Sequence, residues 1–221
     1  MLLKTIAVFL INFSIMGLSL FLPRMSLYYP LAWTYLAIFF GAAAIIACYL
    51  FLFDKDLLRK RLLSPIDEPR LLQKIIQLTA GVFTVCIYAV SAFDSRFKWS
   101  LVPFWVSCFS EIMVLVSFAI LFFVFRQNRF LSTSVEIQEN QKVVSTGLYG
   151  IVRHPMYFAL SLQIIFTPPA LGSYWAMILS GCLIAVLFFR AIDEEKTLKQ
   201  SLPGYEEYCE KVKYRLIPLA L

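Results

Sequence analysis

Long runs of apolar residues, separated by short polar stretches, limit the possible folds of this 221-residue chain more than any other feature. Several runs approach or exceed the roughly 18–20 apolar residues that a helix needs to cross a bilayer. In lipid the backbone must satisfy its own hydrogen bonds, so such runs fold as helices. We predict an all-α polytopic membrane protein with five or six transmembrane helices, at residues 5–22, 31–53, 75–93, 101–125, 156–171 and 173–190.

Three of these segments admit a second interpretation. Pro168 and Pro169 interrupt the fifth, so the last two form either two full crossings or a hairpin that does not fully cross. The first segment begins with Lys4 before an apolar run, as secretion signals do. Its flank Pro23-Arg24-Met25 is not a small-x-small cleavage site, so we expect a retained helix.

Basic residues are distributed unevenly around the predicted helices. With six helices, every Lys and Arg except Arg24, Arg96 and Lys98 falls on one side. The positive-inside rule places that side, with both termini and the loop 126–155, in the cytoplasm, and a five-helix count gives the same sidedness. The basic excess therefore indicates topology, and we do not predict nucleic-acid binding. We expect an integral protein of a bacterial or archaeal inner membrane, or of the endoplasmic reticulum in a eukaryote.

Polar segments interrupt or follow the apolar runs. The first, 54–74, predicts either a helix on the membrane surface, anchored by Arg59, Lys60 and Arg61, or a solvated basic loop. The second, 126–155, is a long loop of the kind that often carries function. Beyond Arg190 the tail predicts one or two amphipathic helices at the cytoplasmic interface, with Pro203 at a helix start.

The only histidine of the chain, His154, lies in the loop sequence GLYGIVRHPMY. Pro155 suits the first turn of a helix, and the free N–H groups of such a turn attract anionic ligand groups. The rings of Tyr149 and Tyr157 offer faces to a cation. The alternative is an interfacial anchor at the level of the lipid headgroups. We predict no metal site, because no second histidine exists and no cysteine lies at ligand spacing.

Charged residues also occur at the end of the last apolar run and within the fourth. Arg190 and Glu194 share one face if the helix continues, and the final hairpin brings them close to the loop around His154. They form either a functional charged patch or a helix-end ion pair with a snorkelling arginine. Glu111, inside the fourth run, is interpreted as a structural hydrogen-bond partner.

Three short sequences of the chain resemble those of a known family. GLYGIVRHPMY, EEKTL and PGYEEYCEKVKYRLIP together resemble the isoprenylcysteine carboxyl methyltransferase family, part of a wider group of integral-membrane methyltransferases that includes phospholipid N-methyltransferases. The specific motifs cover about residues 128–218, and DKDLLRKRL upstream is also similar to compact prokaryotic members. The resemblance implies one integral-membrane domain, 1–221, with a helical scaffold at 1–125 and a cofactor-binding catalytic region at 126–221.

The family's cofactor, S-adenosylmethionine, is bound without a Rossmann domain in a pocket at the cytoplasmic membrane boundary. Here the last hairpin, the loop before it and the C-terminal amphipathic helices would form that pocket. The resemblance implies a substrate-facing, catalytic role for Arg190. It implies cofactor contacts for Gln138, Gln141, Lys142, Val143, Val144, Gly147, Tyr149, His154, Pro155, Met156, Tyr157 and Glu194.

The predicted function is S-adenosylmethionine-dependent methyl transfer to a lipophilic substrate that enters from the bilayer. The nominal reaction is carboxyl O-methylation of a C-terminal S-isoprenylcysteine. Alternatives are N-methylation of a phospholipid amine and S-methylation of a small thiol. A non-enzymatic transporter or scaffold, and a membrane reductase using a nicotinamide cofactor, remain as alternatives of other classes.

Overall fold

The structure is a computed structural model that describes residues 1–62, 70–132 and 141–217. Every regular element in these ranges is helical, which confirms the predicted all-α class. The elements are α1 (Leu2–Arg24), α2 (Pro30–Phe53), α3 (Lys55–Arg61), α4 (Leu71–Phe97), α5 (Phe104–Gln127), the 3₁₀ turn η2 (Gly147–Gly150), α6 (Pro155–Ala170), α7 (Ala176–Ser201) and α8 (Tyr205–Lys211).

Among the described helices, α1, α2, α4, α5 and α7 are long and apolar enough to cross a membrane. This agrees with the predicted five or six spans and makes the chain an integral membrane protein. The fifth predicted helix, at 156–171, corresponds to α6, which has 16 residues and a length of about 24 Å, less than the roughly 30 Å of a hydrocarbon core. Pro168 and Pro169 lie in its last turn, so they shorten the helix without kinking its middle.

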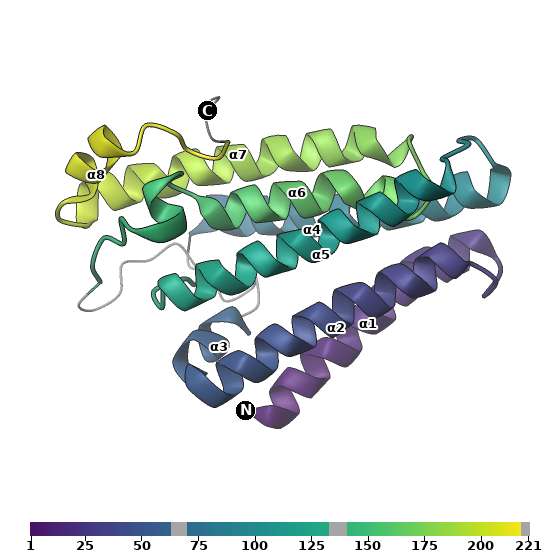
Figure 1. The fold of residues 1–221 in the computed structure, drawn as a ribbon, viewed down its shortest axis with the longest axis horizontal. Coiled ribbons are helices and arrows are strands. Elements are labelled where there is room, and N and C mark those ends of the chain that lie inside the picture. Colours follow the sequence, from purple (N-terminus) through teal and green to yellow (C-terminus); the bar gives the residue numbers. More distant parts are fainter. Residues whose placement is uncertain (63–69, 133–140, 218–221) are drawn as a thin grey trace.

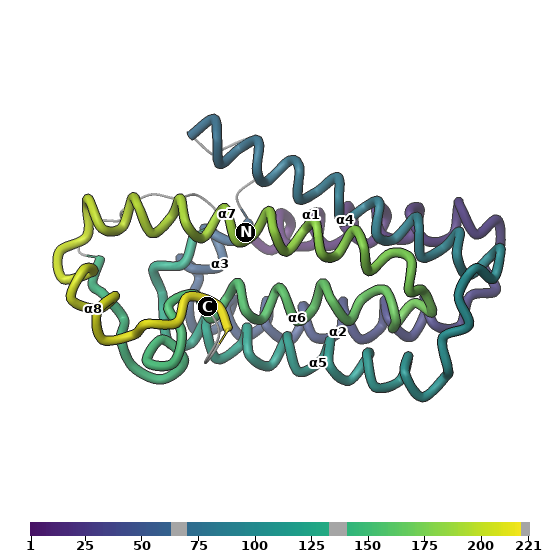
Figure 2. The backbone as a smooth tube through the Cα atoms, turned by 90° about the horizontal axis from the view of Figure 1, so that it is seen from above, coloured from purple at the N-terminus to yellow at the C-terminus, as the bar shows by residue number. Residues whose placement is uncertain are grey.

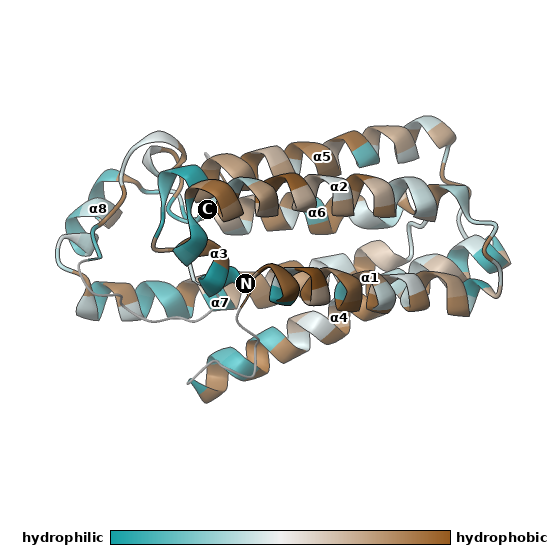
Figure 3. Ribbon diagram, turned by 90° about the horizontal axis from the view of Figure 1, so that it is seen from below, coloured by the Kyte–Doolittle hydropathy of each residue, from teal (hydrophilic) through white to brown (hydrophobic). Residues whose placement is uncertain are grey.

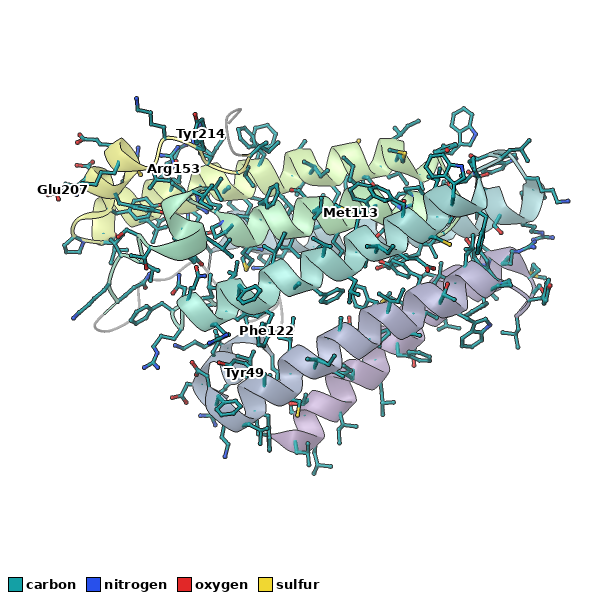
Figure 4. The ribbon with its side chains drawn as sticks, in the orientation of Figure 1. Tyr49, Met113, Phe122, Arg153, Glu207 and Tyr214 are labelled. Carbon is teal, nitrogen blue, oxygen red and sulfur yellow. The ribbon has the colours of Figure 1, made fainter. Side chains whose placement is uncertain are left out.

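The long helices form two layers, seen edge-on in Figure 2. One layer contains α1, α4 and α7, and the other contains α2, α5 and α6. Helices α6 and α7 pack against each other across the layers as an antiparallel hairpin. At the α3 end, Figure 1 shows the α1–α2 pair diverging from the other helices. There Tyr49 of α2 and Phe122 of α5 face each other with ring centroids 4.9 Å apart (Figure 4).

Side chains from α5 and from the start of α2 bind the backbone at the end of the short α6. Ser107 of α5 donates a hydrogen bond of 2.8 Å to the carbonyl of Pro169, and Tyr29 donates one of 2.5 Å to that of Leu171. Leu171 itself is fully buried. Non-helical backbone at this depth is thus satisfied within the protein, as a lipid environment requires.

Helix α3 begins where Asp54 accepts a hydrogen bond from the backbone N–H of Leu57, an N-cap arrangement. Leu57 and Leu58 are buried in the protein, and Arg61 lies over the ring of Phe125. Of the two predicted alternatives, the structure has a helix at Lys55–Arg61 rather than a loop, and its leucines pack inside the protein. Residues 63–69 of that segment lie outside the described ranges.

The other predictions for charged and tail segments have mixed outcomes. Glu111 accepts a hydrogen bond from the Thr34 hydroxyl of α2, which confirms its structural role. Helix α7 continues past Arg190 to Ser201, so Arg190 and Glu194 do lie on one helix. The helix start predicted at Pro203 is wrong, because Gly204 at φ +80° caps α8 and the helix begins at Tyr205. Glycine is favoured at this cap because its φ is positive.

Candidate functional site

Polar residues gather at one end of the bundle, around α3, α8 and the last turns of α7 (Figure 3). The loop before α6 enters this end through a tight turn. Gly147 has φ +62°, and a Cβ there would lie 2.7 Å from Gln127 Oε1. That oxygen accepts a hydrogen bond of 2.9 Å from the backbone N–H of Leu148. The positive φ favours glycine, and a Cβ would push the Gln127 amide away from the N–H of Leu148, so Gly147 docks the loop on the end of α5.

Tyr149 continues the loop into the bundle and is buried. Its hydroxyl accepts a hydrogen bond of 3.1 Å from Asn128, and its carbonyl accepts one of 2.7 Å from the hydroxyl of Tyr208 on α8. Burial raises the pKa values of Tyr149, Tyr205 and Tyr208 above the ordinary value for a phenol. All three are therefore neutral phenols near pH 7, and none supplies a base.

Helix α6 begins as the sequence predicts, with His154 at the N-cap and Pro155 at the first helical position. The C-terminal strap, residues 212–217, pairs with the residues just before it. The backbone N–H of Arg153 donates to the carbonyl of Tyr214 at 2.9 Å, and that of His154 donates to the carbonyl of Arg215 at 2.8 Å. Figure 4 shows Arg153 and Tyr214 side by side at this point. The strap thus fixes the entry to α6.

Glu195 is the centre of a buried ion cluster that the sequence reasoning missed. Its side chain is 4% exposed, and Oε1 lies 3.2 Å from both Arg153 Nε and His154 Nε2. Its other oxygen accepts a hydrogen bond of 3.0 Å from Arg215 Nε. The cluster ties α7 to both the α6 entry and the strap. The His154 imidazole is therefore engaged in holding three chain segments together.

Glu194, the residue before Glu195 on α7, takes part in a separate chain of hydrogen bonds. The Tyr157 hydroxyl donates a hydrogen bond of 2.7 Å to Glu194 Oε2 and accepts one of 2.9 Å from Arg190 Nε. Tyr157 is buried, so the chain Arg190–Tyr157–Glu194 is protected from solvent. One phenol therefore fixes the positions of a cation and a carboxylate on the same face of α7.

These elements enclose a cavity with about 880 Å³ of space between protein atoms, part of it open to solvent. Every predicted site residue except Gln138 and Gly147 lines it: Gln141, Lys142, Val143, Val144, Tyr149, His154, Pro155, Met156, Tyr157, Arg190 and Glu194. Gln138 lies outside the described residues, and Gly147 acts on the loop from outside the lining.

Sequence reasoning missed much of the opposite wall. Leu202, Tyr205 and Tyr208 line the cavity from α8 and its approach, and they pack on Val143 and Val212. The sequence predicts amphipathic C-terminal helices at the pocket, but it does not single out these residues as parts of the wall. Asn128, Phe130, Leu131 and Ser132 complete the wall from the end of α5.

In the described ranges, no cluster of three or more His, Cys, Asp or Glu residues could hold a metal ion.

No curated protein matches the chain. Residues 107–200 match the Isoprenylcysteine carboxyl methyltransferase (ICMT) family, and this segment runs from the first turn of α5 to the last turn of α7. It therefore includes most of the cavity wall, with Tyr157, Arg190 and Glu194. In this segment, which is less than half of its length, the chain is similar to the isoprenylcysteine carboxyl methyltransferase family, a family of membrane methyltransferases.

Proposed function

We propose that the protein transfers a methyl group from S-adenosylmethionine to a lipophilic acceptor, and that the cavity between α6, α7 and α8 holds the cofactor. The observation that carries this proposal is the buried line Arg190–Tyr157–Glu194. It holds a carboxylate and a cation at fixed positions on one wall of the cavity. In this proposal the carboxylate of Glu194 binds the cofactor, and the guanidinium of Arg190 binds the methyl acceptor.

The groups in the cavity fit the chemistry of the cofactor. Glu194 would accept hydrogen bonds from its amine or its ribose hydroxyls, and the first-turn N–H groups of α6 would bind its carboxylate. The rings of Tyr149, Tyr157, Tyr205 and Tyr208 line the walls and offer faces to a cation or to an adenine. When bound, S-adenosylmethionine supplies an electrophilic methyl group on a sulfonium.

For methyl transfer the protein must align the acceptor with the methyl group and exclude water. Arg190 lies where the apolar part of α7 meets its polar extension, so its charge favours an acidic acceptor group at the membrane boundary. A carboxylate with an ordinary pKa of about 4 is already ionised and needs no base. The buried, neutral tyrosines would not deprotonate an amine or a thiol. We therefore favour carboxyl O-methylation, with S-isoprenylcysteine as the reference acceptor that the family name provides.

The cofactor is tested by titrating detergent-purified protein with S-adenosylmethionine and with its demethylated product. We expect saturable binding of both compounds. Glu194→Gln removes a charge-assisted hydrogen bond and should weaken binding of S-adenosylmethionine about 10-fold or more. Glu207→Gln is the matched control, because Glu207 is exposed on α8 and points away from the site (Figure 4). Absence of saturable binding by the unmutated protein would refute the proposed cofactor.

The acceptor is tested with labelled S-adenosylmethionine and three candidate classes: a prenylated cysteine, an aminophospholipid and a small thiol. We expect base-labile methyl incorporation, typical of a carboxyl ester, with the acceptor that has a carboxylate. Incorporation only into base-stable products would favour N- or S-methylation. Binding of a nicotinamide cofactor in place of S-adenosylmethionine would favour a reductase. Membrane transport without methyl transfer would favour the transporter interpretation.

A further inference from the structure

A second cavity lies deeper in the bundle, between the two helix layers that Figure 2 shows edge-on. Helices α2, α4, α6 and α7 line it, mostly with aliphatic and aromatic side chains. On α6 and α7 its lining begins at Leu160 and Leu187, one helical turn from the site residues Tyr157 and Arg190. The cavity therefore lies directly on the membrane side of the proposed active site, where the hydrocarbon chain of a lipophilic methyl acceptor would extend.

The deep end of this cavity is closed by three hydrogen-bonded residues, which we call the floor: Tyr35 of α2, Tyr88 of α4 and Thr167 of α6. The hydroxyl oxygens of Tyr35 and Thr167 are 2.8 Å apart, and Tyr88 is hydrogen-bonded to Tyr35. The rings of the two tyrosines have centroids 6.2 Å apart. All three residues are buried, so helices from both layers are connected at this level.

The helices pack closely just beyond the floor. One turn further from the active site lie Ala32 on α2, Ala92 on α4 and Ala170 on α6. Each of these alanines is fully buried. Small side chains at such positions allow the backbones of membrane helices to approach one another closely. A ligand chain that extended past the floor would therefore have to displace a tyrosine ring.

The distance between the active site and the floor limits the length of such a chain. On α6, Thr167 lies seven residues beyond Leu160 and ten beyond Tyr157, or about 10 and 15 Å along the helix axis. With carbon–carbon bonds of about 1.5 Å and bond angles of about 111°, an extended chain advances about 1.25 Å per carbon. The two distances therefore correspond to about 8–12 carbons. An isoprenoid chain has four main-chain carbons per unit, so two or three units fit and a fourth does not.

We propose that this cavity holds the isoprenoid chain of the methyl acceptor, and that Tyr88 of the floor limits this chain to three isoprene units. The identity of the acceptor rests on the proposed function. Lipid is as apolar as the cavity, so the hydrophobic effect does not draw a longer chain into the protein. The cavity discriminates between chains by fit, because a chain that is too long overpacks the floor. Tyr88 is then a specificity-determining residue for chain length.

The test compares S-geranylcysteine, S-farnesylcysteine and S-geranylgeranylcysteine, which have two, three and four isoprene units. Each competes with a fluorescent S-farnesylcysteine for the purified full chain in detergent, so binding is measured without methyl transfer. We expect the first two to bind within about threefold of each other and the third about 10-fold more weakly, as the cost of overpacking predicts. Variants are compared with the unmutated protein in the same micelles, which removes differences in how the three compounds partition into detergent.

Substitutions on α4 should move the length limit in opposite directions. Tyr88→Leu shortens the side chain at the floor, so S-geranylgeranylcysteine should bind within about threefold of S-farnesylcysteine. Tyr88→Phe keeps the ring and should retain the discrimination. Thr84→Leu fills the cavity one turn nearer the active site and should weaken S-farnesylcysteine relative to S-geranylcysteine. Val82→Leu is the control, because Val82 is 64% exposed and does not line the cavity.

Binding of S-geranylgeranylcysteine as tight as that of S-farnesylcysteine by the unmutated protein would overturn the proposal, whether or not the variants fold. So would failure of the fluorescent compound to bind, or an undiminished discrimination in folded Tyr88→Leu. Titration with S-adenosylmethionine, done on the same preparation, separates the two proposals. Length discrimination without cofactor binding would refute the proposed function alone, and cofactor binding without length discrimination would refute the length limit alone.

Discussion

The two ends of the helix bundle each contain a buried carboxylate, but the partners of the two carboxylates differ. At the far end, Asp94 is fully buried and accepts three hydrogen bonds of 2.6 Å, from the backbone N–H and hydroxyl of Ser100 and from the hydroxyl of Ser173. At the cavity end, Glu195 contacts two guanidinium groups and an imidazole.

The difference indicates two roles. The contacts of Asp94 join two loops, whereas those of Glu195 hold the chain segments that border the cavity. Neutral donors around Asp94 connect the α4–α5 loop to the α6–α7 loop, and no ion pair of Asp94 occurs in the part of the chain that the structure describes. Around Glu195, side chains that are usually charged converge from the α6 entry, α7 and the strap. Bringing Arg153 and Glu195 out of water has a desolvation cost that only their mutual contacts offset. A protein accepts that cost where chain segments must be held at fixed positions, as next to a ligand cavity.

The largest expected effect is from Glu195→Ala at the cavity end. It leaves Arg153 and His154 buried without their carboxylate, so we expect the free energy of unfolding to fall by about 3–5 kcal/mol. Binding of S-adenosylmethionine should also be lost, because the α6 entry is no longer tied to α7. Thermal unfolding in detergent and cofactor titration measure the two effects. Glu210→Ala, an exposed glutamate of α8, is the control. An unchanged melting temperature would show that the cluster contributes no net stability.

Asp94→Ala tests the far end and should have a smaller effect on stability. It leaves three neutral donors without an acceptor, and we expect a loss of about 3 kcal/mol. Cofactor affinity of the folded protein should stay within about twofold, because the far end has no contact with the cavity. Thermal unfolding and titration of the same sample check both parts. A loss of cofactor binding as large as in Glu195→Ala would contradict the separation of the two ends.

Gly147→Ala should have the smallest effect of the three and act only at the cavity end. An alanine at φ +62° is strained, and its Cβ would displace Gln127 from the N–H of Leu148. We expect a cost of about 2 kcal/mol and weaker cofactor binding. Gly181→Ala is the matched control, since a Cβ there meets nothing within 4 Å and the residue lies inside helix α7. It should leave stability unchanged or increase it by up to about 1 kcal/mol. Equal effects of the two substitutions would contradict the role assigned to the Gly147 turn.

The comparison of the two ends also shows how far sequence reasoning reached. Tyr157 and Arg190 were placed together because the hairpin between them must return to the same side of the membrane. Their contact through the Tyr157 hydroxyl bears out this closeness. No sequence pattern predicts that Asp94 binds its serine donors, because Ser173 is 79 positions away in the chain. Likewise Arg215 reaches Glu195 only because the strap folds back over α6.

The sequence by itself determined the membrane helices, the start of α6 at Pro155 and the end of the bundle at which the site residues gather. Those features depend on local terms: apolar length, backbone hydrogen bonding within each helix, and the fixed φ of proline. Only the tertiary structure decided that Glu194 faces the cavity while Glu195 faces the ion cluster. Adjacent residues on a helix point about 100° apart, and the packing of α6, α8 and the strap around α7 selects which one meets which surroundings.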